Sequence, residues 1–149
     1  MKLVLQRVTE ASVSVDGRLL SSIGPGLLVF LCIEKGDGEA VADHYARKVT
    51  ELRIFPDEAG KMNRSVKETG GSILLISQFT LAADVEKGRR PSFDRAAPAE
   101  EAERRYSYFA QKIREEGITV QTGIFQAHMN VALVNDGPVT ILLGNRSTE

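Results

Sequence analysis

The sequence has few of the residues on which disulfide scaffolds and metal centres depend. Its 149 residues include one cysteine, two histidines and no tryptophan. A single cysteine excludes an internal disulfide framework. Cys32 stands in the apolar run LLVFLCI, where we expect a small buried side chain and not a reactive thiol. Neither His44 nor His128 has a cysteine or a second histidine at ligand spacing, so we expect no metal site.

Charge of one sign and long apolar segments are also lacking. The formal net charge is −1, which provides no global attraction to nucleic acid or anionic membranes, so any polyanion has to meet a local basic patch. No apolar run approaches the roughly 20 residues of a membrane-spanning helix, and the alternating, charged N-terminal segment does not resemble a signal peptide. The glycine-rich stretches match neither the Walker nor the dinucleotide-binding fingerprint. We therefore expect a cytoplasmic protein without a cofactor.

The composition that remains is typical of one globular domain spanning residues 1–149, because 42% hydrophobic and 26% charged residues suffice for a core and a solvated surface. Asp16-Gly17 predicts a β-hairpin. Helical periodicity from about Glu39 to Arg53 predicts one main helix, and a second is expected to begin with Pro98 in its first turn and to end at Gly117. Strands are expected at residues 27–33, 72–79, 118–124, 131–134 and 139–143, and a loop at 56–71. We predict an α+β fold, a mostly antiparallel β-sheet or barrel with two main helices.

Residues 77–80, with the sequence SQFT, follow the apolar run of the 72–79 strand with an unexpected cluster of polar side chains. Ser77, Gln78 and Thr80 surround Phe79, and buried polar groups are unfavourable unless they are paired. Ser77 and Thr80 are candidate nucleophiles, yet no histidine or lysine stands beside them in the sequence. A triad that uses His128 as its base stays open because triads form in space, although no G-x-S-x-G motif supports it.

Two further segments have unusual residue patterns, a cluster of basic residues and a glycine-proline pair. Lys87, Arg89 and Arg90 cluster in the loop at 82–97, and arginine matches phosphate oxygens well, so these residues are candidates for contacts to an RNA backbone; a solvated loop is the alternative. In the segment NDGPVT at 135–140, Asn-Asp-Gly-Pro at 135–138 predicts a turn between two strands. Its Gly137-Pro138 bond has only a modest trans preference, so the cis and trans forms both remain alternatives.

Together these motifs resemble those of the D-aminoacyl-tRNA deacylase (D-tyrosyl-tRNA deacylase) family. The motifs are LQRV near the start, ISQFTL, GRRPSF, TGIF and NDGPVT. The resemblance extends from the first strand to about residue 144, and the combination of SQFT with NDGPVT is specific to this family. The chain departs from the family pattern at Gln126, which stands where the tripeptide FGA is expected.

The resemblance implies a homodimer that hydrolyses the ester between a D-amino acid and tRNA and that also removes glycine mischarged on tRNA. It implies that Gly137-Pro138 is a cis pair whose carbonyl groups enter the active site of the other subunit, and that Arg7 orients this motif. A rigid backbone block near the α-carbon would reject L-amino acids and accept D side chains or glycine. The resemblance also implies that Phe125, Ala127 and Met129 line the pocket for the terminal adenosine.

Under this interpretation the candidate catalytic residues are Ser77, Gln78, Phe79 and Thr80. An aminoacyl ester is already activated and has a neighbouring 2′-hydroxyl, so positioning groups and fixed oxyanion donors are sufficient without a conventional base. A covalent mechanism through Thr80 is the rival, and it lacks an activating partner in the sequence. Two alternatives are a non-catalytic RNA-binding module that uses the basic 87–95 loop and an esterase of small molecules.

Overall fold

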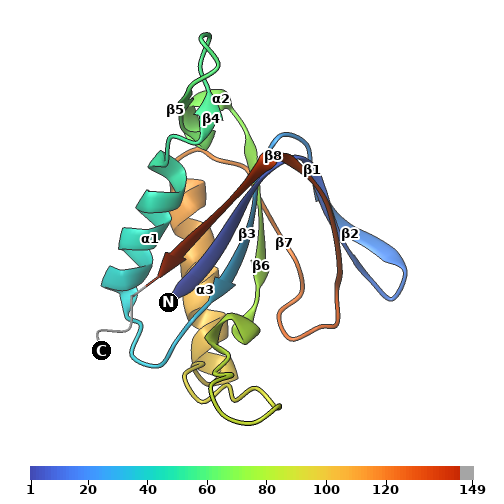
Figure 1. The fold of residues 1–149 in the computed structure, drawn as a ribbon, viewed down its shortest axis with the longest axis vertical. Coiled ribbons are helices and arrows are strands. Elements are labelled where there is room, and N and C mark those ends of the chain that lie inside the picture. Colours follow the sequence, from blue (N-terminus) through green and yellow to red (C-terminus); the bar gives the residue numbers. More distant parts are fainter. Residues whose placement is uncertain (145–149) are drawn as a thin grey trace.

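The first and last strands of the described residues are also the longest of them, and they pair with each other. The structure is a computed structural model that describes residues 1–144. Strand β1 (Lys2–Val15) lies antiparallel to β8 (Asn130–Gly144) along most of their length, and both strands bend where their register shifts. Figure 1 shows the two strands side by side through the middle of the molecule, with the β1–β2 hairpin at its edge.

The sheet around these strands closes almost into a barrel. Its strand order is β2-β1-β3-β6-β7, with β8 on β1. The remaining strands of this sheet are β2 (Arg18–Ile23), β3 (Gly26–Cys32), β6 (Ser72–Ser77) and β7 (Val120–Thr122). The Ser21 hydroxyl on β2 donates to the Thr122 carbonyl on β7 at 2.7 Å. This bond joins the first and last strands of the order, β2 and β7.

Two long helices connect the parallel strands and cover one face of the sheet (Figure 1). Helix α1 (Glu39–Glu51) lies between β3 and β6 in the chain, and α3 (Ala99–Glu115) lies between β6 and β7. The pairs β3–β6 and β6–β7 are parallel, as strands joined by such crossovers are. The smaller elements are β4 (Phe55–Pro56), β5 (Met62–Arg64), helix α2 (Val66–Thr69) and a 3₁₀-helix, η1 (Phe79–Ala82).

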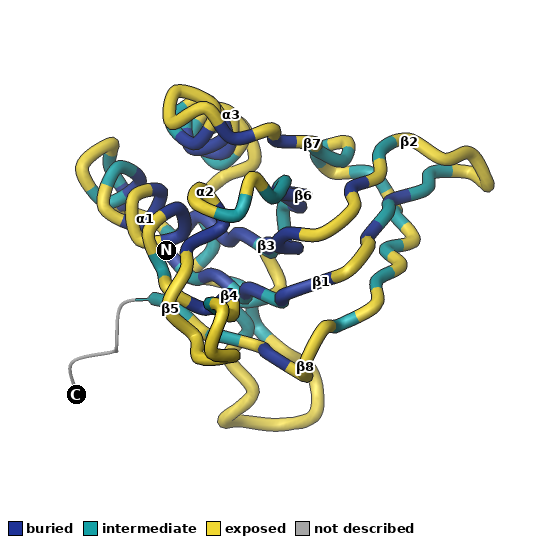
Figure 2. The backbone as a smooth tube through the Cα atoms, turned by 90° about the horizontal axis from the view of Figure 1, so that it is seen from above, coloured by how far each residue is buried: buried dark blue, intermediate teal, exposed yellow. Residues whose placement is uncertain are grey.

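The two faces of the sheet build two separate cores. On the helix side, Leu27 and Leu31 of β3 belong to the same buried cluster as Phe109 of α3. Inside the barrel, alternate residues of the same strands, such as Leu28 on β3 and Leu74 on β6, pack with residues of β1, β2 and β8. Strands buried on both faces form the centre of the molecule (Figure 2), which explains the nearly continuous apolar runs of β3 and β6.

The structure confirms the α+β class, the 16–17 hairpin and the two main helices, and it corrects five details. The sheet is mixed, with two parallel pairs that we did not predict. The 72–79 strand ends at Ser77, because the chain turns there into η1. Pro98 is the N-cap of α3 and not a first-turn residue, since its ψ of 146° is not helical. The segment 56–71, which has the pattern of a loop, contains β5 and α2.

The fifth correction concerns the turn predicted at 135–138, which is a bulge within the continuous strand β8. Gln6 pairs with Thr140 and Val8 with Asn135, so four residues of β8 lie opposite Arg7 alone. Proline has no N–H for the ladder and is tolerated at a bulge. The chain therefore bends outward at this point and continues along β1 where a true turn would have reversed it.

Among residues 1–144, no helix has the length and apolar character needed to cross a membrane.

Candidate active site

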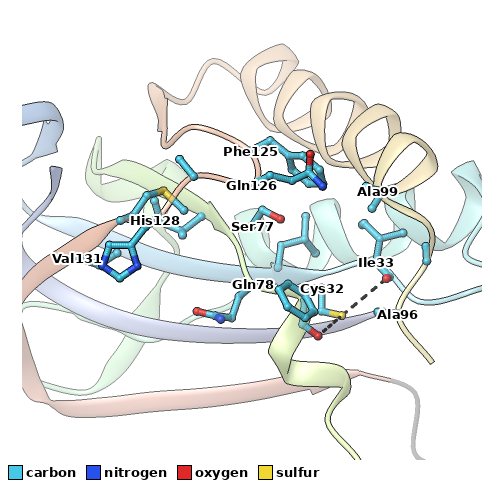
Figure 3. A pocket seen from close by; sticks show the side chains of 17 residues that line it. Cys32, Ile33, Ser77, Gln78, Ala96, Ala99, Phe125, Gln126, His128 and Val131 are labelled. Atoms are coloured by element: carbon cyan, nitrogen blue, oxygen red, sulfur yellow. Dashed lines mark hydrogen bonds between the residues drawn. The ribbon is translucent and has the colours of Figure 1, made fainter. Parts of the chain in front are cut away.

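A cavity of about 520 Å³ opens where the carboxyl ends of the parallel strands β3 and β6 meet the start of α3. Ligand sites of mixed and parallel sheets commonly form at such strand ends, because the chain leaves the sheet there and exposes loops and side chains. Three small residues, Ala97, Ala99 and Ala102, line the side toward α3 and leave room for a ligand. The remaining wall comes from the turn at 124–127 and from the first part of β8, as Figure 3 shows.

Residues 77–80 stand at the mouth of this cavity. Ser77 is the last residue of β6 and pairs with Leu31 of β3, and the Gln78 N–H still donates to the Leu31 carbonyl at 2.8 Å. Ser77, Gln78 and Phe79 line the cavity, whereas Thr80 does not. The polar side chains follow the buried strand because the strand ends there: Ser77 and Gln78 are half-buried, and Phe79 and Thr80 are exposed.

The start of η1 also supplies backbone donors. In a 3₁₀-helix the first N–H groups have no acceptor within the helix, and here the first intrahelical donor is Leu81, which bonds to Gln78 O at 3.2 Å. The N–H groups of Phe79 and Thr80 precede it. The Thr80 hydroxyl accepts a hydrogen bond from the Gln78 side-chain amide, a group that cannot remove its proton.

Cys32 lies directly behind this segment. Its side chain is 1% exposed, as expected for a small buried residue, and its thiol donates to the Phe79 carbonyl at 3.5 Å. Burial, followed by the charge of Glu34, raises the pKa of Cys32 to about 11. The thiol is therefore protonated at neutral pH, and it stabilises the first peptide of η1 as a donor.

The turn at 124–127 carries the second group of candidate residues. Phe125, Ala127 and Met129 all line the cavity together with residues 77–79. Phe125 packs against Tyr106 of α3, with ring centroids 6.1 Å apart, and the Tyr106 hydroxyl donates to the backbone carbonyl of residue 75 in β6. Gly123 makes the packing of Met129 possible, because a Cβ at this position would lie 2.5 Å from the Met129 sulfur.

Gln126 occupies a backbone conformation that favours glycine. Ala127 N donates to Ile124 O at 3.2 Å, which closes a four-residue turn with Gln126 in its third position. The φ angle of Gln126 is 66°, as a type II turn requires at this position. A left-handed conformation is less favourable by about 1–2 kcal/mol for a residue with a Cβ. The chain thus keeps the turn that glycine would form, and it adds a side chain to the cavity wall.

The two histidines do not form a catalytic triad or a metal site in the described residues. His44 is exposed on α1. His128 lines the same cavity as Ser77, but no hydrogen bond joins the two, and Figure 3 shows their side chains well apart. Within residues 1–144, no group of three or more histidine, cysteine or acidic side chains is arranged to hold a metal ion.

Arg7 and the motif at 135–140 lie outside the cavity, on the bulge between β1 and β8. The Gly137-Pro138 bond is cis, and both residues are exposed. Arg7 is buried, with its Nε donating to Asp136 O at 2.9 Å and its Nη1 donating to Ile54 O at 2.7 Å. The Asn135 side chain bridges the bulge, since it accepts from Val139 N at 2.8 Å and donates to Val139 O at 3.1 Å. The motif is held firmly while its tip faces solvent.

The basic loop lies next to the cavity mouth. Backbone bonds between Asp84 and Ser92 close it. Lys87, Arg89 and Arg90 are exposed, and in the part of the chain that the structure describes none of them forms an ion pair. The Phe93 ring packs edge-on against Phe79, with centroids 5.1 Å apart. This contact connects the loop to the segment 77–80.

The structure therefore brings Ser77, Gln78 and Phe79 together with residues 125–129, but it does not bring Arg7, Gly137 or Pro138 to the same cavity. Sequence reasoning missed the alanines at the start of α3 and the wall residues of β3. The run AAPAEEA was an available signal, because small residues at a helix start leave space. The wall residues of β3 gave no signal, since their apolar run is that of any central strand.

The matching family model and the curated relatives name the same family. The family model described as D-Tyr-tRNA(Tyr) deacylase matches residues 4–144. A D-aminoacyl-tRNA deacylase of Thermomicrobium roseum is 60% identical over 143 residues, which are 96% of this chain and 93% of that protein. One from Geobacter sulfurreducens is 59% identical over 147 residues, 99% of this chain and 97% of its own length.

Two solved structures share the fold. One, titled "c-Myc DNA Unwinding Element Binding Protein", has a TM-score of 0.92 and 43% identity and covers 99% of this chain and 100% of its own. The other, described as a probable eukaryotic D-amino acid tRNA deacylase, has a TM-score of 0.82, covers 95% of this chain and 97% of its own, and at 17% identity shows similarity of fold alone.

Proposed function

The chain belongs to the D-Tyr-tRNA(Tyr) deacylase family, and we propose on this basis that it hydrolyses the ester between a D-amino acid and the 3′-terminal ribose of tRNA. The match of the family model over residues 4–144 is the observation that carries the proposal. By the same reaction the protein would remove glycine mischarged on tRNA. Water adds to the ester carbonyl, the bond to the ribose oxygen breaks, and the amino acid and the free tRNA are released.

We assign residues 77–80 to positioning and to stabilisation of the oxyanion. The Phe79 and Thr80 N–H groups at the start of η1 would donate to the negative oxygen of the tetrahedral intermediate. Ser77 at the end of β6 would orient the ester, and the substrate's own 2′-hydroxyl would assist the attacking water. The hydrogen bond from Cys32 and the bond from Gln78 to Thr80 support this assignment, because they fix the segment before substrate binds.

The rival, covalent role for Thr80 finds no support in its surroundings. A nucleophilic hydroxyl needs a base within hydrogen-bond reach. The Thr80 hydroxyl accepts from an amide, and its residue is not part of the cavity wall. A His128–Ser77 pair would also need a hydrogen bond that is not formed. We therefore propose a mechanism without a covalent aminoacyl-enzyme.

We further propose that the 137–138 pair of a second copy completes the site. The pair is exposed and lies outside its own cavity, while Arg7 and Asn135 hold its backbone in place. A rigid backbone near the α-carbon would clash with an L side chain, whereas a D side chain or a glycine hydrogen points elsewhere. Such a block explains how one site could accept D-amino acids of many sizes.

A homodimer is the assembly that this proposal requires. Strand β8 pairs with β1 and has no second neighbour among the described strands, so that one edge is open. Leu142 on this strand is 75% exposed. In a two-fold symmetric dimer, each subunit would cover the open edge of the other. Light scattering should find a dimer under assay conditions, and a fully active monomer would contradict the proposal.

The tRNA end has two candidate contacts. We propose that Phe125, Ala127 and Met129 hold the terminal adenosine, because they provide an apolar wall beside Ser77. Lys87, Arg89 and Arg90 would meet phosphates of the preceding nucleotides, since their charges are exposed next to the cavity mouth.

Hydrolysis of matched D- and L-tyrosyl-tRNA by the purified protein tests the proposal. We expect the D-ester to react at least tenfold faster, which corresponds to ~1.4 kcal/mol in transition-state free energy. Equal rates would contradict the chiral block. A small-molecule esterase would act equally well on simple tyrosyl esters without tRNA.

A nucleic-acid-binding module without catalysis is the second candidate. It is favoured by one observation: the 43% identical structure is titled as a DNA-element-binding protein. The basic 87–95 loop would then be the binding surface. In the same assay such a module would bind tRNA and release no amino acid.

A further inference from the structure

The cavity wall contains one residue whose side chain the backbone does not favour. Gln126 has a left-handed φ of 66° in the third position of its turn, where glycine is more stable. Backbone strain that persists at the wall of a binding cavity points to a role for the side chain. A turn with only a structural role would be more stable with glycine at this position.

The residues that line the cavity indicate which kind of chemical group the Gln126 side chain would contact. None of its lining residues is an aspartate, glutamate, lysine or arginine, so it suits an uncharged group better than a phosphate. Its volume of about 520 Å³ lies within the range of small-molecule sites, about 300–1,000 Å³. Two carboxamides are present in the wall, Gln78 and Gln126, and the amide nitrogen of Gln78 already donates to Thr80.

The Gln126 amide offers a donor and an acceptor side by side. No intramolecular hydrogen bond of the described residues uses it, and Figure 3 shows the side chain extending beside Phe125 at the cavity wall. His128 and Ser77 cannot replace it, because an imidazole edge or a single hydroxyl does not present both functions in one plane. The adenine edge formed by the N6 amino group and N7 is complementary to such a donor and acceptor.

We propose that Gln126 recognises the terminal adenine of the substrate: Oε1 accepts from the N6 amino group, and Nε2 donates to N7. This inference rests on the proposed function, because it assigns the base of the same substrate. The half-buried Phe125 and Met129 would contact the faces of the base, and Gln126 would select its edge. Gln126 is thus a specificity-determining residue and takes no part in the ester chemistry.

The test compares substrates and variants together. The substrates are D-tyrosyl esters of adenosine, 7-deazaadenosine, which lacks the N7 acceptor, and inosine, which lacks the N6 amino group. For the wild type we expect kcat/KM to fall about tenfold with either altered base, the loss typical of a bidentate contact. Gln126→Gly should be about tenfold weaker on adenosine and should no longer distinguish the three bases.

The Gln126→Gly variant should change stability and activity in opposite directions. Gln126→Gly relieves the left-handed conformation, so its unfolding midpoint should rise while its kcat/KM falls. Gln126→Glu keeps the side-chain length but has no donor for N7, and it should lose the discrimination against 7-deazaadenosine. Gln111→Ala, which removes an exposed glutamine of α3, is the matched control and should change neither quantity.

A binding measurement separates this inference from the proposed function. The probe is an analogue of D-tyrosyl-adenosine in which an amide replaces the ester, together with its 7-deaza form, titrated by calorimetry. A preference of about tenfold for the adenosine form in the wild type, lost in Gln126→Gly, supports the inference even if no ester is hydrolysed. Equal affinities in the wild type, no binding of either analogue, or a Gln126→Gly variant that matches the wild type would overturn it.

Discussion

The two polar segments at 77–80 and 135–140 are held in place by different means. The first is set by its position at the end of a parallel strand pair, and its partners come from the adjacent strand β3: the Gln78 N–H bonds to the Leu31 carbonyl, and the Cys32 thiol bonds to the Phe79 carbonyl. The second bulges out of its strand and is held by two side chains, its own Asn135 and Arg7 of β1. Arg7 connects the backbone carbonyls of residues 136 and 54, which lie 129 and 47 positions away from it.

This difference has a functional consequence. The 77–80 segment forms part of a cavity within one chain, whereas the 135–140 segment is exposed at its tip and does not line that cavity. A segment that is both rigid and exposed is suited to act on a partner. We therefore expect changes at 77–80 and in the substrate ribose to affect the chemical step, and changes at 135–140 to affect the choice between D and L substrates.

The largest effect should come from the substrate. A D-aminoacyl-tRNA that ends in 2′-deoxyadenosine should react at least about 100-fold more slowly, a loss of ~2.7 kcal/mol, because the hydroxyl proposed to assist the water is gone. Thr80→Ala should stay within about threefold of the wild type, since it keeps the backbone N–H. Single-turnover rates at saturating enzyme measure both. An inactive but folded Thr80→Ala, combined with normal reaction of the deoxy substrate, would establish Thr80 as the nucleophile.

The next effect concerns the support of the 135–140 segment. Arg7→Ala removes two hydrogen bonds from a buried guanidinium, so we expect the free energy of unfolding to fall by about 2–3 kcal/mol. The preference for D over L substrates should fall in the same variant, because Asp136 loses its support. Urea unfolding and the paired D/L assay provide the two values. Arg53→Ala is the control, since its side chain lies in an exposed contact to Asn63.

Gly137→Ala should act on discrimination with a smaller cost in stability. A Cβ there would lie 2.7 Å from both Val139 Cγ2 and Val139 N, so the tip of the bulge has to shift. We expect the D/L ratio to fall about tenfold, or ~1.4 kcal/mol, while D-ester hydrolysis changes less. Gly17→Ala also places a side chain at a positive φ, but in open space on the 16–17 hairpin, and it should leave the ratio unchanged. An unaltered D/L ratio in Gly137→Ala would show that this segment does not select chirality.

The basic loop should contribute less, and only through binding. Replacing Lys87, Arg89 and Arg90 together by alanine should raise KM for tRNA about fivefold, or ~1 kcal/mol, without lowering kcat. The slope of log affinity against log salt should become less steep by about 2, because three contacts to a single strand contribute about 0.7 each. D-tyrosyl-adenosine, which has no preceding phosphates, should be unaffected. A loss of the same size on this short substrate would remove the phosphate assignment.

The smallest effect concerns Cys32 and appears at alkaline pH. Because the folded-state pKa is raised from 9.0 to about 11, the folded protein holds the thiol proton more tightly than the unfolded chain does. The resulting stability is complete below pH 9 and is lost as the pH rises toward 11. At about pH 10 the loss should be about 1 kcal/mol. Denaturant unfolding of the wild type and of Cys32→Ala at about pH 8 and about pH 10 tests this, and parallel pH profiles would contradict it.

Much of the fold was accessible from the sequence because it depends on local patterns. Asp16-Gly17 predicted the hairpin through turn chemistry, and the 3.6-residue period predicted α1 and α3. The parallel pairing had a signal that we missed: strands at 27–33, 72–79 and 118–124 alternate with helices, an order that favours parallel strands. The 135–138 bulge had no such signal, since an Asn-Asp-Gly-Pro sequence is equally compatible with a turn.

For the site, the sequence by itself determined which residues are chemically unusual, because a polar cluster after an apolar strand and a glycine-proline pair in a β segment depend on residue type alone. Only the tertiary structure decided their grouping. It placed residues 77–79 beside 125–129 in one cavity and separated them from Gly137 and Pro138. It also showed that Gln126 adopts the left-handed conformation of a glycine position. Such facts depend on the register of β3, β6 and β8, which long-range pairing sets and no short stretch of sequence encodes.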